Sequence, residues 1–288
     1  MRANLYALAA IALWASLSAL GVALKHVPPF LLTGIALMIG SVLAWPFVIN
    51  DRRQWQVAPR LLALGVFTLF GFHFMLFIAL RMAPAVEVNL VNYLWPLFIV
   101  VLAPLYLPGV ALRKVHIAAA ITGFVGAAIA ILGARDGSVA ASSSSTSPVW
   151  GYLLALGSAL IWANYSLQTK RAEVNGKSFP TAAIGLFGLV SGALSLACHV
   201  ALEPSVSLSW RDWLLLAVMG LGPLGAAFFL WDKALKLGDA RQIGILSYLT
   251  PLASTVLLMV ITGRALTWSI GVAAAMIIGA AVVGTRRE

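Results

Sequence analysis

The stretch ALRMAPAVEVNLVNYLWPL, residues 79–97, returns later in the chain as ALKLGDARQIGILSYLTPL, residues 234–252. The two stretches align at a constant offset of 155 residues, and each carries a proline, Pro96 or Pro251, inside a long apolar run. Proline lacks a backbone N–H and clashes with the preceding turn, so the interior of an ordinary helix excludes it. The same unusual interruption occurs twice, which indicates that the chain contains two copies of one structural unit.

Composition decides the solvent in which these units fold. The 288 residues are 61% hydrophobic and 10% charged, whereas a soluble domain carries roughly 25% charged residues. Apolar runs of about 20 residues, the length that crosses a bilayer, alternate with short segments that contain charged residues, Pro or Gly. We predict an all-α integral membrane protein with ten transmembrane helices, at residues 4–25, 30–49, 60–82, 85–107, 115–133, 150–171, 180–202, 213–236, 240–262 and 266–285.

The distribution of basic residues predicts the orientation of the chain. Of the 19 Lys and Arg residues, 14 fall on the side of the predicted bundle that holds both chain ends, and 5 fall on the other side. Cytoplasmic loops are enriched in Lys and Arg, so we expect both termini in the cytoplasm. Orientation thus accounts for the net charge of +10. We expect the lipid bilayer and a small-molecule substrate as partners, and no nucleic acid.

Two copies of five helices must enter the membrane from opposite sides, because five is odd. Arg81 then lies outside the cell and its counterpart Lys236 inside. Inverted-topology repeats are characteristic of secondary transporters, in which two similar halves expose a central site to either side in turn. We predict a first five-helix repeat over residues 1–134, an extracytoplasmic Ser-rich linker over 135–149 and a second five-helix repeat over 150–288.

These features resemble a known family. Ten spans in 5+5 inverted order, the Trp-Ala motifs LWAS (13–16) and IWAN (161–164), and a proline-centred fourth span are similar to the EamA branch of the drug/metabolite transporter superfamily. The stretch FFLWDKALKLGDARQIGILSYLTPL (228–252) resembles the aromatic amino acid exporters of the YddG type. The resemblance implies a multi-pass protein of the bacterial inner membrane. It is more specific for the fold than for the substrate, because the superfamily carries many unrelated metabolites.

Polar and aromatic side chains at helical spacing predict a central binding site. Pro96 and Pro251 leave the carbonyls of Asn92 and Ser247 without a helical partner, so a neighbour, water or a ligand must satisfy them. A polar stripe at membrane depth must face protein or water, because exposure to hydrocarbon is costly. We predict that the substrate is bound by Trp14, Ser18, His73, Phe77, Asn89, Asn92, Pro96, Trp162, Tyr165, Ser166, Phe229, Ser247, Tyr248 and Pro251.

Aromatic walls with a few polar groups suit a small amphipathic ligand. An aromatic or other apolar amino acid fits, and so does a flat organic cation held over the rings by cation–π attraction. Composition does not separate these two ligands, and the resemblance favours amino acids. We predict a facilitative exporter that works by alternating access. The alternatives are an exporter of organic cations or drugs, and a proton-coupled antiporter that uses His73.

Other protein classes leave signatures that this sequence lacks. Its four His residues, at positions 26, 73, 116 and 199, are scattered, and neither HExxH nor GxSxG occurs. Cys198 is the only cysteine, so no multi-cysteine metal site can form within the chain. We therefore predict neither an enzyme nor a bound cofactor or metal. Two rows of small residues could pack within the fold or form a homodimer face, and we favour packing within the fold: Ala119, Gly123 and Ala127, and Gly271, Ala275 and Gly279. The oligomeric state stays open, and a homodimer is not indicated.

Overall fold

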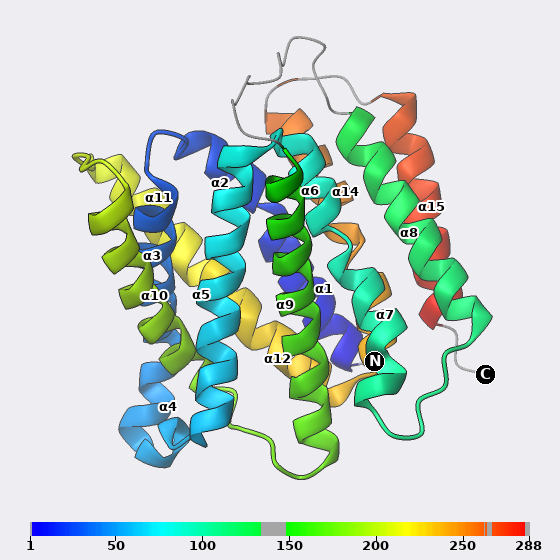
Figure 1. Ribbon diagram of the computed structural model, residues 1–288, viewed down its shortest axis with the longest axis horizontal. Helices are drawn as coiled ribbons and strands as arrows, with labels where there is room; N and C mark the ends of the chain where they lie inside the picture. Colours follow the sequence, from blue (N-terminus) through cyan, green and yellow to red (C-terminus); the bar gives the residue numbers. More distant parts are fainter. Residues whose placement is uncertain (1, 134–147, 262, 264–266, 286–288) are drawn as a thin grey trace.

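The computed structural model describes residues 2–133, 148–261, 263 and 267–285, and every regular element in that part of the chain is a helix, as predicted (Figure 1). Residues 135–147 of the predicted linker lie outside the described residues. The elements before the linker are α1 (Arg2–Ala15), α2 (Leu17–Ala23), α3 (Pro29–Ser41), η1 (Val42–Ala44), α4 (Trp45–Asn50), η2 (Arg52–Trp55), α5 (Pro59–Met82), α6 (Ala85–Asn92), α7 (Trp95–Tyr106) and α8 (Lys114–Gly133). Those after it are α9 (Val149–Val174), α10 (Ala183–Leu202), α11 (Trp210–Leu221), η3 (Gly222–Ala226), α12 (Ala227–Leu237), α13 (Ala240–Leu246), α14 (Leu249–Ile261) and α15 (Trp268–Thr285).

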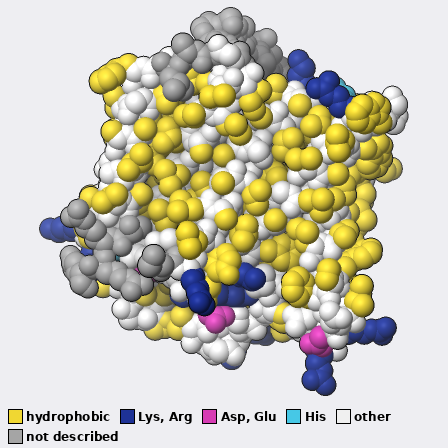
Figure 2. Space-filling model, turned by 180° about the vertical axis from the view of Figure 1, so that it is seen from behind, with side chains coloured by type: hydrophobic (Ala, Val, Ile, Leu, Met, Phe, Trp, Pro, Cys, Tyr) yellow, Lys and Arg dark blue, Asp and Glu magenta, His cyan; other side chains and the backbone are white. Residues whose placement is uncertain are grey.

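Most of these helices suit a membrane. In the described part of the chain, eight helical stretches are long and apolar enough to cross one: Arg2–Ala23, Pro29–Asn50, Pro59–Met82, Ala85–Tyr106, Lys114–Gly133, Ala183–Leu202, Trp210–Leu237 and Ala240–Ile261. The 26-residue α9 has the required length but carries polar residues such as Asn164, Ser166 and Thr169, and α15 contains a shorter apolar helix. Hydrophobic side chains cover the middle of the face in Figure 2, with Lys and Arg toward its edges. This surface suits lipid, and the chain is a membrane protein, as predicted.

Both predicted proline interruptions separate two helices. Tyr93 and Leu94 lie between α6 and α7, and Pro96 follows in the first turn of α7. Ser247 and Tyr248 lie between α13 and α14, again just before a proline. The first turn of a helix has no intrahelical partner for its N–H groups, so proline is tolerated there.

The break in the second half does not leave a free carbonyl. The carbonyl of Ser247, predicted to bond a neighbour, water or a ligand, accepts the backbone N–H of Thr250 at 2.9 Å. A tighter i→i+3 bond has replaced the bond that Pro251 cannot make, as is common at helix ends. Of the three predicted partners, a neighbour therefore satisfies this carbonyl.

Helices from the two parts of the chain pack alongside each other. α3 packs against α10, α5 against α9, α1 against α12, and α8 against α15. The start of α1 and the end of α15 lie at the same end of the bundle (Figure 1). Each of these pairs joins the sequence before the linker to the sequence after it, so the core lies between the two halves.

The two rows of small residues behave differently. Gly123 of α8 lies against the ring of Tyr248, which confirms close packing there. On α15, however, Gly271 and Gly279 have no neighbouring atoms at the position of a Cβ, and the row points outward. α15 packs through Ala273 and Ile277 instead, because it carries small or apolar residues on more than one face. The packing predicted for this second row is wrong.

Candidate functional site

A cavity of about 620 Å³ lies between the two halves of the bundle. Its described lining reaches Lys25 beyond α2, Pro29 at the start of α3 and Leu80 in the last turn of α5. This end, uppermost in Figure 1, is termed the open end, and the opposite end, where α1 and α5 begin, the closed end. Eight of the predicted binding residues line the cavity: Trp14, Ser18, His73, Phe77, Asn89, Asn92, Trp162 and Pro251.

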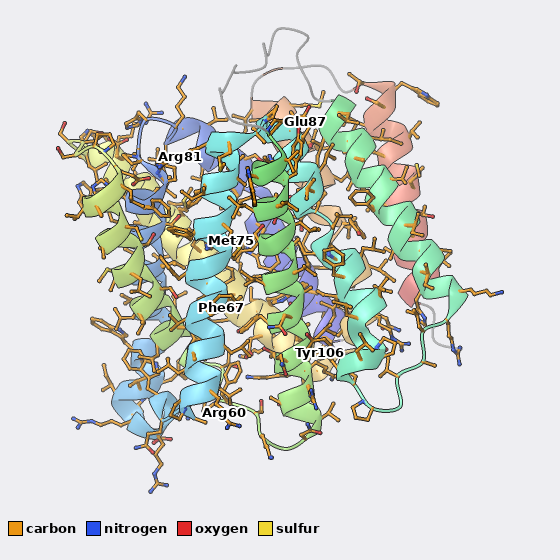
Figure 3. The ribbon with its side chains drawn as sticks, viewed as in Figure 1. Arg60, Phe67, Met75, Arg81, Glu87 and Tyr106 are labelled. Atoms are coloured by element: carbon orange, nitrogen blue, oxygen red, sulfur yellow. The ribbon has the colours of Figure 1, made fainter. Side chains whose placement is uncertain are left out.

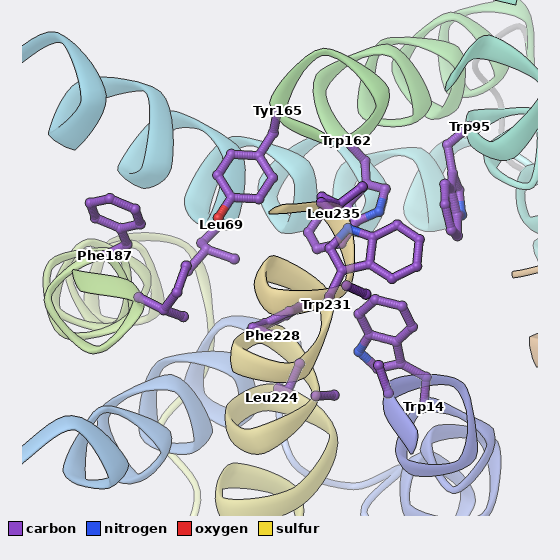
Figure 4. Close-up of a cluster of buried hydrophobic side chains, with 14 of the residues drawn as sticks. Trp14, Leu69, Trp95, Trp162, Tyr165, Phe187, Leu224, Phe228, Trp231 and Leu235 are labelled. Atoms are coloured by element: carbon purple, nitrogen blue, oxygen red, sulfur yellow. The ribbon is translucent and has the colours of Figure 1, made fainter. Parts of the chain in front are cut away.

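Aromatic rings form the floor of the cavity (Figure 4). The ring centroid of Trp162 lies 5.7 Å from that of Trp14, 6.3 Å from that of Trp95 and 5.6 Å from that of Phe228. The contacts are edge-to-face or tilted, arrangements that add about 0.5–1.5 kcal/mol per pair beyond the buried area. The four rings come from four different helices, so they tie both halves of the bundle together beneath the cavity.

Hydrogen bonds hold this floor in place. The indole Nε1 of Trp14 donates to the carbonyl of Pro223 at 3.1 Å. Trp231, fully buried below the floor, donates from its Nε1 to the hydroxyl of Ser166 at 3.2 Å. Ser166 was predicted to contact the substrate, but it lies outside the cavity and orients an indole instead. Its side chain faces the neighbouring helix because a buried indole N–H needs an acceptor.

A π-helical turn explains why Phe228, and not the predicted Phe229, lines the cavity. Residues Gly222–Ala226 form this turn, in which Ala227 donates its N–H to Gly222 rather than to Pro223. The turn leaves the Pro223 carbonyl available to Trp14. One extra residue in a turn rotates the following helix by about 100° relative to α-helical spacing. The predicted Phe229 does not line the cavity, and its neighbour Phe228 does.

His73 sits in the cavity wall between two phenylalanine rings. Its ring centroid lies 5.1 Å from that of Phe72 and 5.9 Å from that of Phe77. Its Nδ1 lies 2.6 Å from the carbonyl oxygen of Leu69. A carbonyl only accepts, so in the neutral ring Nδ1 carries the proton and Nε2 is left as an acceptor for a ligand.

Hydroxyl and amide groups supply the remaining polarity. The hydroxyls of Ser18 and Ser254 share a hydrogen bond of 2.5 Å, and the hydroxyl of Ser158 donates to Asn92 Oδ1 at 2.9 Å. Thr250 lines the cavity, and its hydroxyl oxygen is buried without a hydrogen-bond partner in the described part of the chain. Buried polar groups are nearly always paired, so this hydroxyl is an exception.

Four further predicted residues lie outside the cavity. Tyr165 belongs to the aromatic core, and Pro96 is buried where α7 meets α13. The hydroxyl of Ser247 donates to a carbonyl of its own turn at 2.6 Å. The ring of Tyr248 packs against Gly123 of α8. The break between α13 and α14 changes the direction of successive side chains, so regular helical spacing fails there.

Sequence reasoning missed several residues that line the cavity. Trp95 and Phe72 directly precede predicted residues, so adjacency to Pro96 and His73 was the signal available. Ser254 lies seven residues after Ser247, on the same predicted stripe. No sequence signal marks the others, Thr33, Phe228 and Thr250.

Charge is scarce in the cavity. Among the described residues that line it, Lys25 alone carries a formal charge when His73 is neutral, and none is a carboxylate. Lys25 lies at the open end, away from the aromatic floor. The interior thus offers rings, hydroxyls, amides and an imidazole to a ligand.

The model of the EamA-like transporter family matches residues 1–132 and again residues 149–285. The chain belongs to the EamA-like transporter family. A relative from Ancylobacter novellus named aromatic amino acid exporter YddG is 40% identical over 291 aligned residues, which cover 98% of this chain and 96% of that protein. The protein of the same name from Escherichia coli strain K12 is 27% identical over 301 aligned residues, which cover 99% of this chain and 98% of that protein.

The fold of this EamA-like transporter recurs in a crystal structure that is 36% identical to it. The two superpose with a TM-score of 0.88 over 98% of this chain and 97% of the other. Family and relatives are membrane transporters, which agrees with the predicted exporter and with the prediction that the chain is not an enzyme.

At the closed end of the EamA-like bundle, the two members of a buried ion pair within α12 form hydrogen bonds to the segment before α10. The Nζ of Lys236 lies 2.7 Å from Oδ2 of Asp232 and donates to the carbonyl of Phe179 at 2.7 Å. The hydroxyl of Thr181 donates to the same carboxylate oxygen at 2.6 Å. The Asp232 side chain is fully buried, so its charge depends on these contacts.

At the open end, the carboxylate of Glu203 joins three helices. It accepts the backbone N–H groups of Phe30 at 3.0 Å and Leu31 at 3.2 Å, at the start of α3. The guanidinium of Arg81, from α5, donates to it at 2.9 Å. Nδ1 of His199, from α10, lies 3.1 Å away. Glu203 thereby ties α3, α5 and α10 together beside the mouth of the cavity.

Proposed function

We propose that this chain is an alternating-access exporter of aromatic and other apolar amino acids, located in the bacterial inner membrane. The cavity carries the proposal, because aromatic rings wall it, few polar groups line it and its described lining reaches only the open end. Its volume of about 620 Å³ lies in the range of small-molecule sites. The 40% identical relative named as an aromatic amino acid exporter supports this substrate class.

The proposal includes ten spans in two inverted repeats of five, at residues 1–134 and 150–288, with an extracytoplasmic linker and cytoplasmic termini. The double match of the family supports two repeats. Packing also supports two equivalent repeats. The third span (α5) packs on the sixth (α9), and the corresponding spans of the other repeat, the eighth (α12) and the first (α1), pack on each other in the same way. Cysteine labelling that placed residues 138–148 and the C-terminus on one face of the bilayer would overturn this topology.

Charge favours an amino acid over an organic cation as the substrate. No described lining residue is a carboxylate that could pair with a permanent cation. An amino acid zwitterion suits the cavity better, because Nε2 of His73 can accept from its ammonium group, while Lys25 can donate to its carboxylate. The side chain then lies on the aromatic floor of Trp14 and Trp162.

Alternating access requires the two ends to exchange roles. Below the floor, the closed end is held by the hydrogen bonds of Lys236 and Asp232 to Phe179 and Thr181, before α10, and by a hydrogen bond of 2.9 Å from Tyr106 to Asn164, between α7 and α9 (Figure 3). Release of these contacts, with closure around Arg81 at the open end, would expose the site to the cytoplasm. A substrate can shift this equilibrium only by binding the two states differently.

Counterflow in proteoliposomes tests the proposed substrate. Vesicles loaded with unlabelled tryptophan should accumulate labelled tryptophan, phenylalanine or leucine transiently, while glutamate and a quaternary ammonium ion should not exchange. Exchange of the quaternary ion alone would reassign the protein to organic cations. A channel would equilibrate the label without transient accumulation.

The pH profile tests whether transport is facilitative, as we propose, or proton-coupled through His73. The His73→Gln variant keeps a polar side chain but cannot titrate near neutral pH. A facilitator should give wild-type and variant profiles of the same shape between about pH 5 and 8. Disappearance of a pH-dependent limb in the variant would establish the proton-coupled alternative.

A further inference from the structure

A second hollow, of about 560 Å³, lies at the closed end, between the first turn of α5 and the last turns of α9. It shares no lining residue with the substrate cavity. Arg60 stands at the lower end of α5 in Figure 3. Three cationic side chains and two amides converge on the hollow, with small or apolar residues between them: Ala58, Arg60, Leu61, Gln168, Arg171, Ala172, Asn175 and Lys177.

The cations of this hollow are free. Within the described ranges, no carboxylate pairs with Arg60, Arg171 or Lys177, and none lines the hollow. By contrast, Lys236 and Arg241 at the same end each form an ion pair. Three like charges around one space repel each other, and an anion among them is attracted by all three.

One of the two helix ends around the hollow favours an anion. Ala58 and Leu61 place the hollow at the N-terminus of the 24-residue α5, where the helix dipole attracts negative charge. The backbone carbonyls in the last turn of α9 already accept hydrogen bonds from backbone N–H groups, as at Arg171, Ala172 and Glu173. They therefore do not need the cationic side chains as partners.

Above the hollow, the surface of α5 and α9 is apolar. Phe67 lies seven residues after Arg60 on α5, about 10 Å along the helix axis, and is 53% exposed (Figure 3). Leu160 on α9 is 41% exposed. A charged hollow thus continues into a hydrophobic strip on neighbouring helices.

We propose that the hollow binds the headgroup of an anionic phospholipid of the cytoplasmic leaflet. Arg60, Arg171 and Lys177 hold the phosphate oxygens, and an acyl chain lies along Phe67 and Leu160. Basic pockets between membrane helices on the cytoplasmic side are suited to such headgroups. A free phosphate carries the charge but has no use for the apolar strip. The lipid would bridge α5 and α9, which belong to different halves of the chain.

Lipid binding to the purified full-length protein tests this site without any measurement of transport. Native mass spectrometry and thermal unfolding in a neutral detergent would compare phosphatidylglycerol, phosphatidylcholine and inorganic phosphate. We expect phosphatidylglycerol alone to remain bound and to raise the unfolding temperature. In the variant R60Q/R171Q/K177Q its affinity should fall roughly a hundredfold, because each basic residue near an anionic lipid contributes roughly fivefold.

A matched variant separates the hollow from general charge attraction. R52Q/R53Q/K114Q removes three exposed basic residues from the same end, outside the hollow, and should bind phosphatidylglycerol as the wild type does. Equal losses in both triple variants would overturn the proposal. Equal stabilisation by inorganic phosphate would overturn the assignment to a lipid. If R60Q/R171Q/K177Q does not fold, R171Q and K177Q alone should each weaken binding about fivefold, and no change in either would refute the site.

Discussion

The two ends of the bundle carry similar cation–ring contacts in different surroundings. At the open end, the guanidinium of Arg81 lies 5.7 Å from the ring centroid of Phe30 and pairs with a buried carboxylate. At the closed end, the ammonium of Lys236 lies 4.2 Å from the ring centroid of Phe179 and also pairs with a buried carboxylate. Arg81 and Lys236 are equivalent residues of the sequence repeat. Equivalent positions in the two halves thus make the same kind of contact at opposite ends.

The surroundings of the two cations differ in access to water. The side chain of Arg81 is 43% exposed and that of Lys236 is 10% exposed. Solvent-exposed ion pairs contribute about 0–1 kcal/mol, whereas loss of one partner from a buried pair costs about 3–5 kcal/mol. We infer that the contact fastens the bundle at the closed end and holds it only loosely at the open end, where the cavity has its mouth.

Loss of the closed-end cation should have the largest effect. Lys236→Met keeps the length of the side chain but leaves the buried charge of Asp232 uncompensated. We expect the free energy of unfolding to fall by about 3–5 kcal/mol, measured by chemical denaturation in detergent. Lys233→Met removes an exposed cation from the same helix and should cost less than about 1 kcal/mol. Equal losses in both variants would mean that the buried pair does not hold this end.

The aromatic floor separates the two ends, and its removal should have the next largest effect. Trp162→Ala deletes a ring that contacts rings of four other helices, and each aromatic contact contributes about 0.5–1.5 kcal/mol. We therefore expect tryptophan to bind about tenfold more weakly, measured by calorimetry on the folded fraction. Trp150→Ala changes an indole on the same helix that is 63% exposed, and it should leave the affinity unchanged. Identical affinities in the two variants would remove Trp162 from the site.

The sequence predicts an interruption of a helix only where a single residue causes it. The breaks before Pro96 and Pro251 follow from a missing N–H, a property of single residues. The π-helical turn at Gly222–Ala226 does not, because close packing of Gly225 against Gly40 of α3 accompanies it and only the folded chain brings these residues together. The sequence therefore does not show that Phe228, rather than the predicted Phe229, lines the cavity.

The contacts between cations and rings could not be predicted from the sequence either. The equivalence of Arg81 and Lys236 is visible in the sequence repeat, but the rings they contact are about 50 or more residues away along the chain. No local pattern joins Arg81 to Phe30, or Lys236 to Phe179. Only the folded chain brings α5 to the start of α3, and α12 to the segment before α10.

A smaller effect is expected at the open end. In Arg81→Ala, the carboxylate of Glu203 keeps the N–H groups of Phe30 and Leu31 and the imidazole of His199. We expect the free energy of unfolding to fall by no more than about 1 kcal/mol, and the difference from wild type to shrink as salt is added. Denaturation at low and high salt measures both. A salt-independent loss as large as that of Lys236→Met would show that the two ends are fastened equally.

The smallest effect concerns the loops that precede α6 and α13. Asp239, which precedes α13 at the closed end, accepts the N–H of Arg241 at 2.8 Å and pairs with its guanidinium at 2.6 Å. Its counterpart at the open end, at the offset of 155 residues, is Pro84, which cannot titrate. Burial opposes ionisation of Asp239, but the contacts with Arg241 outweigh it, and the pKa of Asp239 lies below its ordinary value of 3.8.

Because the pKa of Asp239 is lowered in the folded protein, acid should remove the stability that its carboxylate contributes. The ionised carboxylate stabilises the fold fully above pH 3.8, and this contribution disappears as the pH falls through the lower pKa of the folded state. Asp239→Asn should therefore be less stable than wild type by about 0.5 kcal/mol near pH 7, because it loses a partly exposed ion pair. The two proteins should converge in acid unfolding below the pKa. Pro84→Ala should shift stability by the same amount at every pH. A difference between Asp239→Asn and wild type that persisted unchanged in strong acid would show that the side chain acts through shape alone, and the closed end would then lack this titratable contact.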